Sequence, residues 1–368
     1  MKSVDIIEGI QNYVVNWAKI KKGENILIVA DSLADPDVVD LTAAVARGQK
    51  ANVVVSWIEF NPLQAQGGGK ILEAAIKGTD KLLRFTFAMS HDRGTVEACQ
   101  EFGLRMYGVA NPTKEFFASE AAKFPVPLII EIARETVQRA RAGKRVHITD
   151  DKGTDLWAEG RPENWGCAIR PRDFRGDYKN WDYDTELPGN YPMTFPGEVV
   201  GLIPPENGNG VTVFVAYSRI GICKTPLKFT FKDNYFIKVD GGEEADALKG
   251  IIEGIPHANF LDEIMFGLHP KTRNILDQKP IPNEAERRAG NLHIGVGNRR
   301  LMSMRPFKET SKIELHLDGF ILNPTITVGE DVLVDKGRLT VLDSPRIREL
   351  AKEYGNSDKL LAQTFGGR

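Results

Sequence analysis

The chain has 368 residues, of which 42% are hydrophobic and 27% are charged, a composition typical of a folded globular protein of roughly two domains. Its 48 basic and 50 acidic side chains nearly cancel. No net electrostatic field therefore attracts nucleic acid or an acidic membrane surface, and we expect neither as a partner.

The amino-terminal segment carries apolar residues at helical spacing, which predicts an amphipathic helix over residues 3–20. Charged and amide side chains lie among the apolar ones, unlike the unbroken apolar core of a signal peptide. No other run approaches the roughly 18 to 20 apolar residues that span a bilayer. We therefore expect no membrane segment and a cytoplasmic protein.

The first 130 or so residues continue with alternating strand and helix patterns. Short β-branched runs predict strands, and segments with apolar spacing of three to four predict helices. Strands are expected at 26–30, 52–58 and 81–88, and helices at 36–47, 71–77 and 95–103. This βαβ order indicates a parallel sheet.

The second half has short strand patterns separated by Gly and Pro, which is typical of antiparallel hairpins and meanders. Strands are expected at 144–149, 198–203, 211–216, 227–231, 235–240, 312–320, 325–327 and 331–334, and helices at 243–253, 257–266 and 345–363. The sequence thus predicts an α/β, Rossmann-like domain over residues 1–145. A mixed, largely antiparallel β domain with helices is expected over residues 146–368 and would carry a metal site.

A segment rich in Trp, Tyr, Pro and Gly lies between residues 157 and 196 and has little periodicity. Segments of this length without regular structure are more often functional than idle. We expect it to serve as an active-site cover that stacks on a flat ring, or as an arm in a homo-oligomer.

Two common kinds of site are not indicated by the sequence. The three cysteines Cys99, Cys167 and Cys223 are far apart and lack CxxC spacing, so buried thiols are expected in place of disulfides or a thiolate zinc site. The run QGGGK at residues 66–70 lacks the spacing of a phosphate loop, and no GxGxxG follows the first strand. We expect no nucleotide cofactor.

Four of the six histidines lie in one stretch of sixty residues in the second half: His257, His269, His293 and His316. Pro270 after His269 fixes a turn that aims the ring inward or outward. The glycines after His293 permit close approach of the backbone. Any one histidine alone is more often structural, but their grouping indicates a shared site.

The pair formed by His316 and Asp318 has the geometry of a chelate, because alternate residues of a strand project from the same face. Two histidines and one carboxylate are the ligands of non-haem Fe(II) oxygenases, and imidazole and carboxylate also suit zinc, cobalt and manganese. The alternative is that His316 is a half-buried strand residue beside an exposed aspartate.

Three further side chains are candidates. Glu198 and Glu263 are flanked by apolar residues, and burial of a carboxylate is costly unless it is paired or bound to a metal. Glu198 could equally face solvent by strand alternation. His91 follows the strand expected at 81–88, at the sheet edge where ligands collect, and could transfer protons there or cap a helix.

The motifs of the second half together resemble the aminopeptidase T metalloprotease family. They are GTDL at residues 153–156, PGEV at 196–199, DEIMFGLHP at 262–270, HIGVG at 293–297 and HLDG at 316–319. Within that superfamily the chain is similar to the 2,5-dihydroxypyridine 5,6-dioxygenases, mononuclear iron enzymes of nicotinic acid breakdown.

The resemblance implies two alternative sets of metal ligands. The peptidase pattern implies a two-metal centre held by residues at five matching positions: Glu198, Glu263, His293, His316 and Asp318. This chain lacks the tyrosine that the peptidases carry after the first of these histidines, and it has His269 where they have asparagine. The dioxygenase pattern implies an iron triad of His269, His316 and Asp318, with His91 as the group that handles the proton.

Three functions follow, in order of preference. The first is Fe(II)-dependent, extradiol-type cleavage of a 2,5-dihydroxypyridine-like ring, with dioxygen and a small aromatic heterocycle as substrates and His91 and Glu198 as catalytic candidates. The second is a metal-dependent aminopeptidase or amidohydrolase with two metal ions of zinc, cobalt or manganese. The third is a non-catalytic oligomeric binding protein on the same scaffold. The resemblance implies a homo-oligomer.

Overall fold

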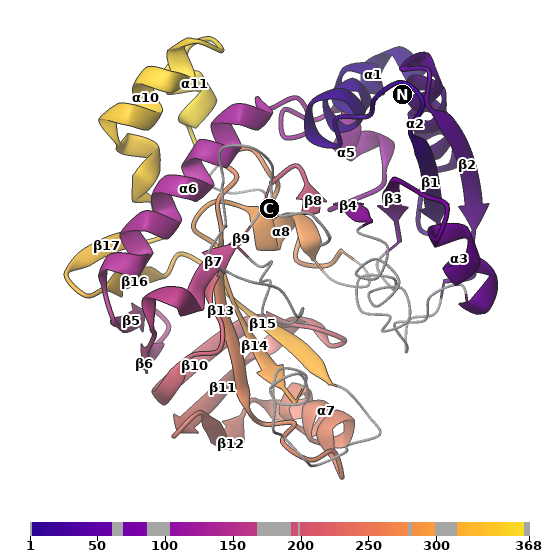
Figure 1. Ribbon diagram of the computed structural model, residues 1–368. Coiled ribbons are helices and arrows are strands. Elements are labelled where there is room, and N and C mark those ends of the chain that lie inside the picture. Colours follow the sequence, from indigo (N-terminus) through magenta and orange to yellow (C-terminus); the bar gives the residue numbers. More distant parts are fainter. Residues whose placement is uncertain are drawn as a thin grey trace. The chain divides into compact units, whose positions relative to one another are not determined.

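The computed structural model describes residues 2–60, 69–86, 104–167, 193–197, 199–278, 282–298 and 315–363 (Figure 1). The chain forms two compact units. Unit 1 draws on residues 1–129 and 174–198, and unit 2 on residues 130–173 and 199–368. The predicted division into two domains, residues 1–145 and 146–368, stays a prediction.

Unit 1 contains a parallel sheet with the strand order β2-β1-β3-β4-β8, as predicted from the βαβ pattern. Its strands are β1 (Asn25–Ala30), β2 (Asn52–Trp57), β3 (Lys81–Phe85), β4 (Arg105–Val109) and β8 (Met193–Phe195). The last strand comes from a distant part of the sequence, so local pattern did not reveal it.

The helices of unit 1 are α1 (Ser3–Gln11), which continues as the π-helical segment η1 (Asn12–Trp17), α2 (Pro36–Gly48), α3 (Gly69–Ile76) and α5 (Lys114–Ala118). α2 begins where the Asp35 side chain accepts a hydrogen bond from the Asp37 amide, with Pro36 at its first position. The helix expected at 95–103 lies outside the described residues.

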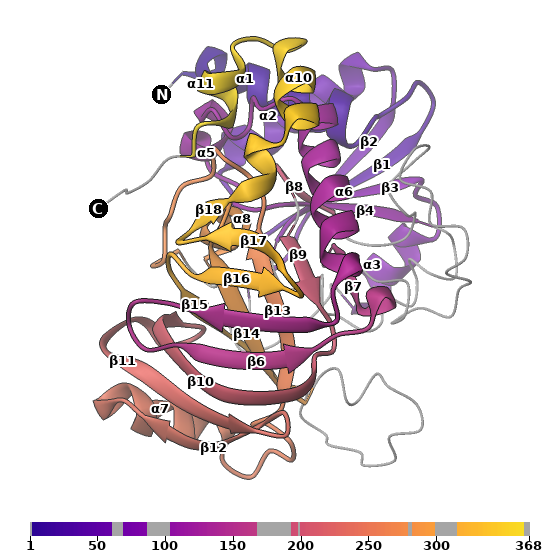
Figure 2. The same ribbon diagram turned by 90° about the vertical axis from the view of Figure 1, so that its left-hand side faces the viewer.

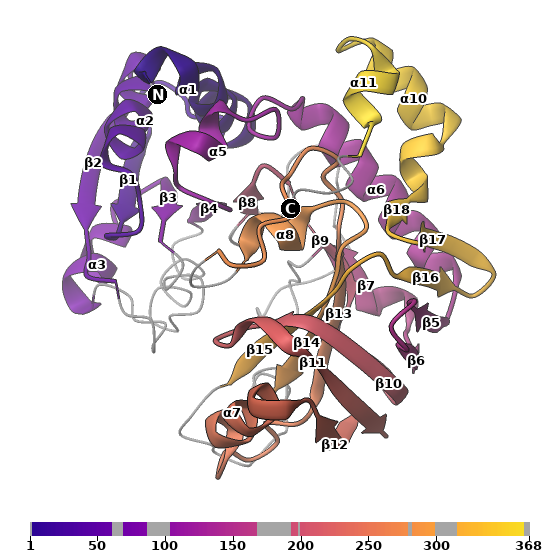
Figure 3. The ribbon, with the colours of Figure 1, turned by 180° about the vertical axis from the view of Figure 1, so that it is seen from behind.

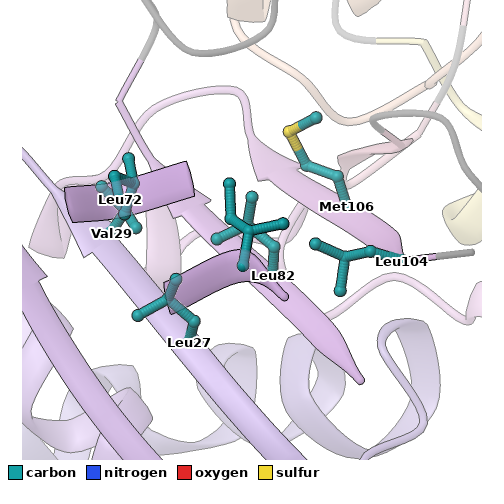
Figure 4. Packing of buried hydrophobic residues seen from close by; sticks show 7 residues of the cluster. Leu27, Val29, Leu72, Leu82, Leu104 and Met106 are labelled. Carbon is teal, nitrogen blue, oxygen red and sulfur yellow. The ribbon is translucent and has the colours of Figure 1, made fainter. Parts of the chain in front are cut away.

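An apolar cluster fills the space between α3 and one face of this sheet (Figure 4). Leu27 and Val29 of β1 lie beside Leu82 of β3 and Met106 of β4, and all are buried. α3 contributes the two positions of its sequence that face the sheet, Leu72 and Ile76. Burial of these apolar side chains therefore stabilises the packing of α3 on the sheet.

Unit 2 is built around one antiparallel sheet, which confirms the strand-rich second half (Figure 2). The order is β18-β17-β16-β5-β6-β10-β15-β14-β13-β9-β7, and β11 pairs with β10 and β12. Its strands are β5 (Arg145–Thr149), β6 (Asp155–Glu159), β7 (Trp165–Cys167), β9 (Val199–Leu202), β10 (Glu206–Tyr217), β11 (Gly221–Lys232), β12 (Tyr235–Asp240), β13 (Leu261–Gly267), β14 (Leu292–Gly297), β15 (His316–Ile321), β16 (Thr325–Val328), β17 (Asp331–Asp335) and β18 (Arg338–Leu339).

The longer helices are α6 (Val126–Ala142), α7 (Gly242–Ile252) and α10 (Pro345–Lys352), and the short ones are α8 (Asn283–Arg287) and α11 (Ser357–Leu361). The helix expected over residues 345–363 is interrupted, because Gly355 has a φ of 146° and Asn356 caps a new helix by accepting from the Lys359 amide. Among the described residues, no helix is long and apolar enough to cross a membrane.

The prediction of a helix at residues 257–266 is wrong, because most of that segment is strand β13. All seven residues of β13 are buried, since β9 and β14 pair with its two edges and both of its faces are covered. A strand buried on both faces shows no alternation, so its apolar run has the same appearance as a buried helix.

We expect Leu82→Ala to destabilise unit 1 by about 2 to 5 kcal/mol, because it removes a fully buried side chain from the cluster under α3. Ile71→Ala is the matched control, since Ile71 lies on α3 with 87% of its surface exposed and should change stability by less than about 0.5 kcal/mol. Urea unfolding of both variants measures the difference. Equal effects would contradict the burial of Leu82 in this cluster.

Candidate metal centre

The strands β13, β14 and β15 of unit 2 are neighbours in the sheet (Figure 3). Their register brings acidic and imidazole side chains to one face. In the register of β13, β14 and β15, Gly295 lies opposite Glu263 on one side and Asp318 on the other. His293 and His316 lie two positions from this row on their own strands. Because strand side chains alternate with a period of two, all four functional groups project from the same face.

One group of possible ligands consists of Glu263, His293 and Asp318, whose donor atoms lie within 4.8 Å of one another. All three side chains are buried. His293 Nε2 lies 3.7 Å from Glu263 Oε1. The sequence pattern of the second half had singled out each of these residues.

A second group consists of Asp262, Glu263 and His316, so Glu263 belongs to both. His316 Nε2 lies 3.1 Å from Glu263 Oε1 and 3.1 Å from Asp318 Oδ1. The other ring nitrogen, Nδ1, lies 2.7 Å from Asp262 Oδ2. A carboxylate on one nitrogen sets the tautomer and orientation of a histidine that ligates through the other nitrogen. Asp262 thus orients His316, and Nε2 faces Glu263 and Asp318.

A β-bulge explains how two consecutive residues reach the same imidazole. Leu261 pairs with Val296 and Glu263 pairs with Gly295, so Asp262 is an extra residue in β13. In a regular strand, Asp262 and Glu263 would point to opposite faces, and the bulge removes that restriction. Asp262 was missed at the sequence level. The only signal for it was a second acidic residue beside Glu263 in an apolar run.

Gly295 leaves the space in which the two strands' side chains meet. A Cβ atom at this position would lie 2.6 Å from Glu263 Cγ and 2.7 Å from His316 Cε1, both far below van der Waals contact. The carboxylate and the imidazole therefore lie over the glycine from opposite sides. Any larger residue at 295 would push apart the two groups that approach each other there.

The backbone of Asp318 is held by Ser218, the residue after β10. The Asp318 amide donates to Ser218 Oγ at 3.1 Å, and the Ser218 amide donates to the Asp318 carbonyl at 2.8 Å. These bonds fix the position at which the Asp318 carboxylate leaves the sheet. Ser218 carried no signal in the sequence because its partner is a hundred residues away.

The charges of the centre perturb the pKa values of both histidines. Burial lowers the pKa of His316, but the negative charges of Asp318 and Glu263 outweigh burial and hold that pKa well above its ordinary value. Burial also opposes the charged form of His293, yet the nearby carboxylates of Glu263 and Glu286 leave its pKa raised. The carboxylates therefore favour positive charge among them.

A fourth carboxyl group faces the same place. Glu286 of α8 is buried, and burial raises its pKa even though His293 and Arg287 favour its charged form. Burial alone would raise the pKa of Asp318 as well, but the positive charge of His316 lowers it. The place of Glu286 in this centre could not be inferred from the sequence, because α8 packs beside β13 only in the folded chain.

The donor set fits a bound transition-metal cation. Buried carboxylates and imidazoles are the ligands that iron, zinc, manganese and cobalt share. His293 Nδ1 is buried and has no hydrogen-bond partner among the described residues. Buried polar atoms in this state are rare unless an ion or ligand completes them.

His269 is buried at the turn after β13 and belongs to neither group of ligands. Its Nδ1 accepts from the Lys271 amide at 3.1 Å, and burial together with the Lys271 charge lowers its pKa to about 3. The ring is therefore neutral at pH 7, which is the form that binds metals. Its place in an iron triad stays a prediction. His91 and Glu198 lie outside the described residues.

Residues 8–341 match the NicX family model, described as 2,5-dihydroxypyridine 5,6-dioxygenase. Two solved structures are similar to this chain, each covering 92% of it and 98% of the solved chain. They are the 2,5-dihydroxypyridine dioxygenase from Pseudomonas putida KT2440, with 15% identity and a TM-score of 0.69, and wild-type AmpT from Thermus thermophilus, with 16% and 0.60. At these identities they show a shared fold. No curated protein matches significantly.

We expect Gly295→Ala to lower the amount of metal that the protein binds, because the added methyl group separates Glu263 from His316. Gly250→Ala is the control, since a Cβ there meets nothing within 4 Å and its helix gains propensity. Metal content is measured by elemental analysis on folded protein, with circular dichroism as the check of folding. Unchanged metal content in Gly295→Ala would contradict this site.

Proposed function

The chain belongs to the 2,5-dihydroxypyridine 5,6-dioxygenase family, and from this premise we propose that it is an Fe(II)-dependent dioxygenase that opens a hydroxylated pyridine ring. The observation that carries the proposal is the convergence of Glu263, His293, His316 and Asp318 on one buried face of three paired strands. Family membership supports a ring-cleaving dioxygenase, and the ligand set supports a metal. The substrates would be a 2,5-dihydroxypyridine-like ring and dioxygen.

The metal would be held by His316 and Asp318 in either assignment, with His269 as the third ligand in the predicted triad. A bound Fe(II) ion with open positions would supply a place where the ring hydroxyl and dioxygen are brought together. Asp262 would keep His316 in the tautomer that presents Nε2, and Ser218 would hold Asp318 in place. Burial of Glu263, His293 and Asp318 would exclude bulk water from their side of the site.

Proton transfer is assigned to residues for which the sequence is the only guide. We propose that His91 removes the proton of the substrate hydroxyl, since imidazole exchanges protons near neutral pH. Extradiol-type opening between the hydroxylated carbon and its neighbour would yield an N-formyl half-amide of maleic acid. Glu198 remains a catalytic candidate, and assembly as a homo-oligomer remains a prediction.

One observation favours a second function, a metal-dependent amidohydrolase or aminopeptidase. Glu263 belongs to both ligand groups, and a shared carboxylate is suited to bridge two metal ions that activate water and polarise a carbonyl. The set also contains more carboxylates than a triad of two histidines and one carboxylate requires. This reading predicts about two metals per chain and turnover without oxygen uptake.

Removal of metal by a chelator should abolish oxygen uptake with 2,5-dihydroxypyridine, and ferrous iron should restore it where zinc does not. His316→Ala should lower the restored rate more than about 100-fold, because it removes a ligand. His147→Ala is the control, as this half-buried imidazole contacts Asp155 and Trp157 on β6. Full activity with zinc would reject the iron enzyme, and protein purified without metal would favour a binding protein.

The two ligand assignments differ in the histidine that accompanies His316. If the iron triad contains His269, His269→Gln should lower bound iron and His293→Gln should retain it. Both rings are buried, so glutamine preserves most of the volume and a polar end. Iron content per folded chain is measured for both variants. Loss in His293→Gln with retention in His269→Gln would make His293, in place of His269, the ligand that accompanies His316 and Asp318.

A further inference from the structure

A second candidate site lies in unit 1, at the carboxyl end of its parallel sheet. The chain runs from β1 to β2 at the edge, and then returns past β1 to β3 and β4, so the direction of winding reverses between β1 and β3. Open α/β sheets bind their ligands outside the carboxyl ends of the strands at such a reversal. The residues that follow β1 and β3 there are Asp31 and Thr86.

Strand register places these two residues side by side on one face. Val29 pairs with Arg84 and Ala30 pairs with Phe85, so Asp31 and Thr86 occupy the next positions along the two strands. By alternation they continue the face that carries Leu27 and Leu82, which is apolar deeper in the sheet (Figure 4). The face thus changes from apolar to polar at its carboxyl end.

Both residues carry a buried polar atom that lacks a partner among the described residues. Asp31 is 1% exposed, and its Oδ1 accepts from the Leu33 amide at 2.9 Å, whereas Oδ2 makes no hydrogen bond. Thr86 is 6% exposed, and its Oγ1 makes none. A buried polar atom left unpaired bears its full desolvation cost. Two residues with such atoms, at adjacent register positions of the reversal point, indicate a ligand that completes them.

The Arg84 side chain contacts the backbone of Thr86 and lies over Gly108 at this end of the sheet. Its Nη1 donates to the Thr86 carbonyl at 2.8 Å, so the residue that carries the hydroxyl is fixed by its own strand neighbour. The guanidinium lies over Gly108, where a Cβ would come within 2.5 Å of Nη2. The glycine therefore makes room for the guanidinium, as a preorganised binding site requires.

We propose that Asp31 and Thr86 bind a small neutral lactam through its ring N–H and the adjacent ring carbonyl. Asp31 Oδ2 accepts from the N–H, and the Thr86 hydroxyl donates to the carbonyl. This acceptor and donor pair complements the lactam edge, whereas an anionic ligand would be repelled by the Asp31 carboxylate. The choice of lactam rests on the proposed function, because a 2-hydroxypyridine ring adopts this form in water.

The test is a ligand-observed NMR titration of the full chain as purified, without dioxygen so that no turnover occurs. The probes are 2-pyridone and N-methyl-2-pyridone, which differ only in the donor that Asp31 would accept. We expect the N-methyl probe to bind at least about tenfold more weakly. Equal binding of the two probes, or no binding of 2-pyridone, would overturn the proposal.

Variants locate the site. Asp31→Asn keeps the oxygen that accepts from Leu33 but replaces the acceptor with a donor, and Thr86→Val removes the hydroxyl at constant shape. Each should weaken the binding of 2-pyridone at least about tenfold. Asp80→Asn is the control and should leave binding unchanged. The Asp80 carboxylate is exposed and accepts from the Asn25 amide at the amino end of the sheet.

A variant of the metal centre separates this site from the proposed activity. Asp318→Asn should retain binding of 2-pyridone, and binding that is lost there but retained in Asp31→Asn would overturn the proposal. The readout needs no bound iron and no oxygen uptake. If the chain shows no dioxygenase activity but still binds 2-pyridone more tightly than N-methyl-2-pyridone, the proposed function is rejected and the lactam site is retained.

Discussion

Carboxylates gathered away from water repel one another, and each of them loses hydration. Unit 2 assembles Asp262, Glu263 and Asp318 in this way on one face of three strands, with Glu286 beside them. Such a group is stable only if positive charge accompanies it. The imidazole of His316 supplies that charge in the chain itself, and a metal cation would supply more. Much of the centre's geometry follows from this requirement.

Neighbouring strands can share a small space only where one of them has no side chain. Gly295 does this in unit 2, where an acidic and a basic side chain close over it, and Gly108 does it in unit 1, where the Arg84 guanidinium covers it. In both sheets the glycine lies next to a charged residue on the adjacent strand. Close approach of buried charge is thus built into the backbone before any ligand arrives.

Local pattern was informative where a residue's partner lies near it in sequence. His316 and Asp318 were expected to share a face because they alternate on one strand, and their side chains do meet at 3.1 Å. The role of Asp262 could not be predicted in this way, since it depends on a bulge created by pairing with β14. β13 itself was taken for a helix because its burial on both faces erases the alternation that marks a strand.

Periodicity and short motifs were enough to identify the two kinds of sheet, the chelating pair on β15 and the family to which the chain belongs. Tertiary structure decided which carboxylates join that pair, where α10 ends and α11 begins, and which polar atoms lie buried at the carboxyl end of the parallel sheet. Those features depend on register between strands distant along the chain, and register is set by how whole faces are buried.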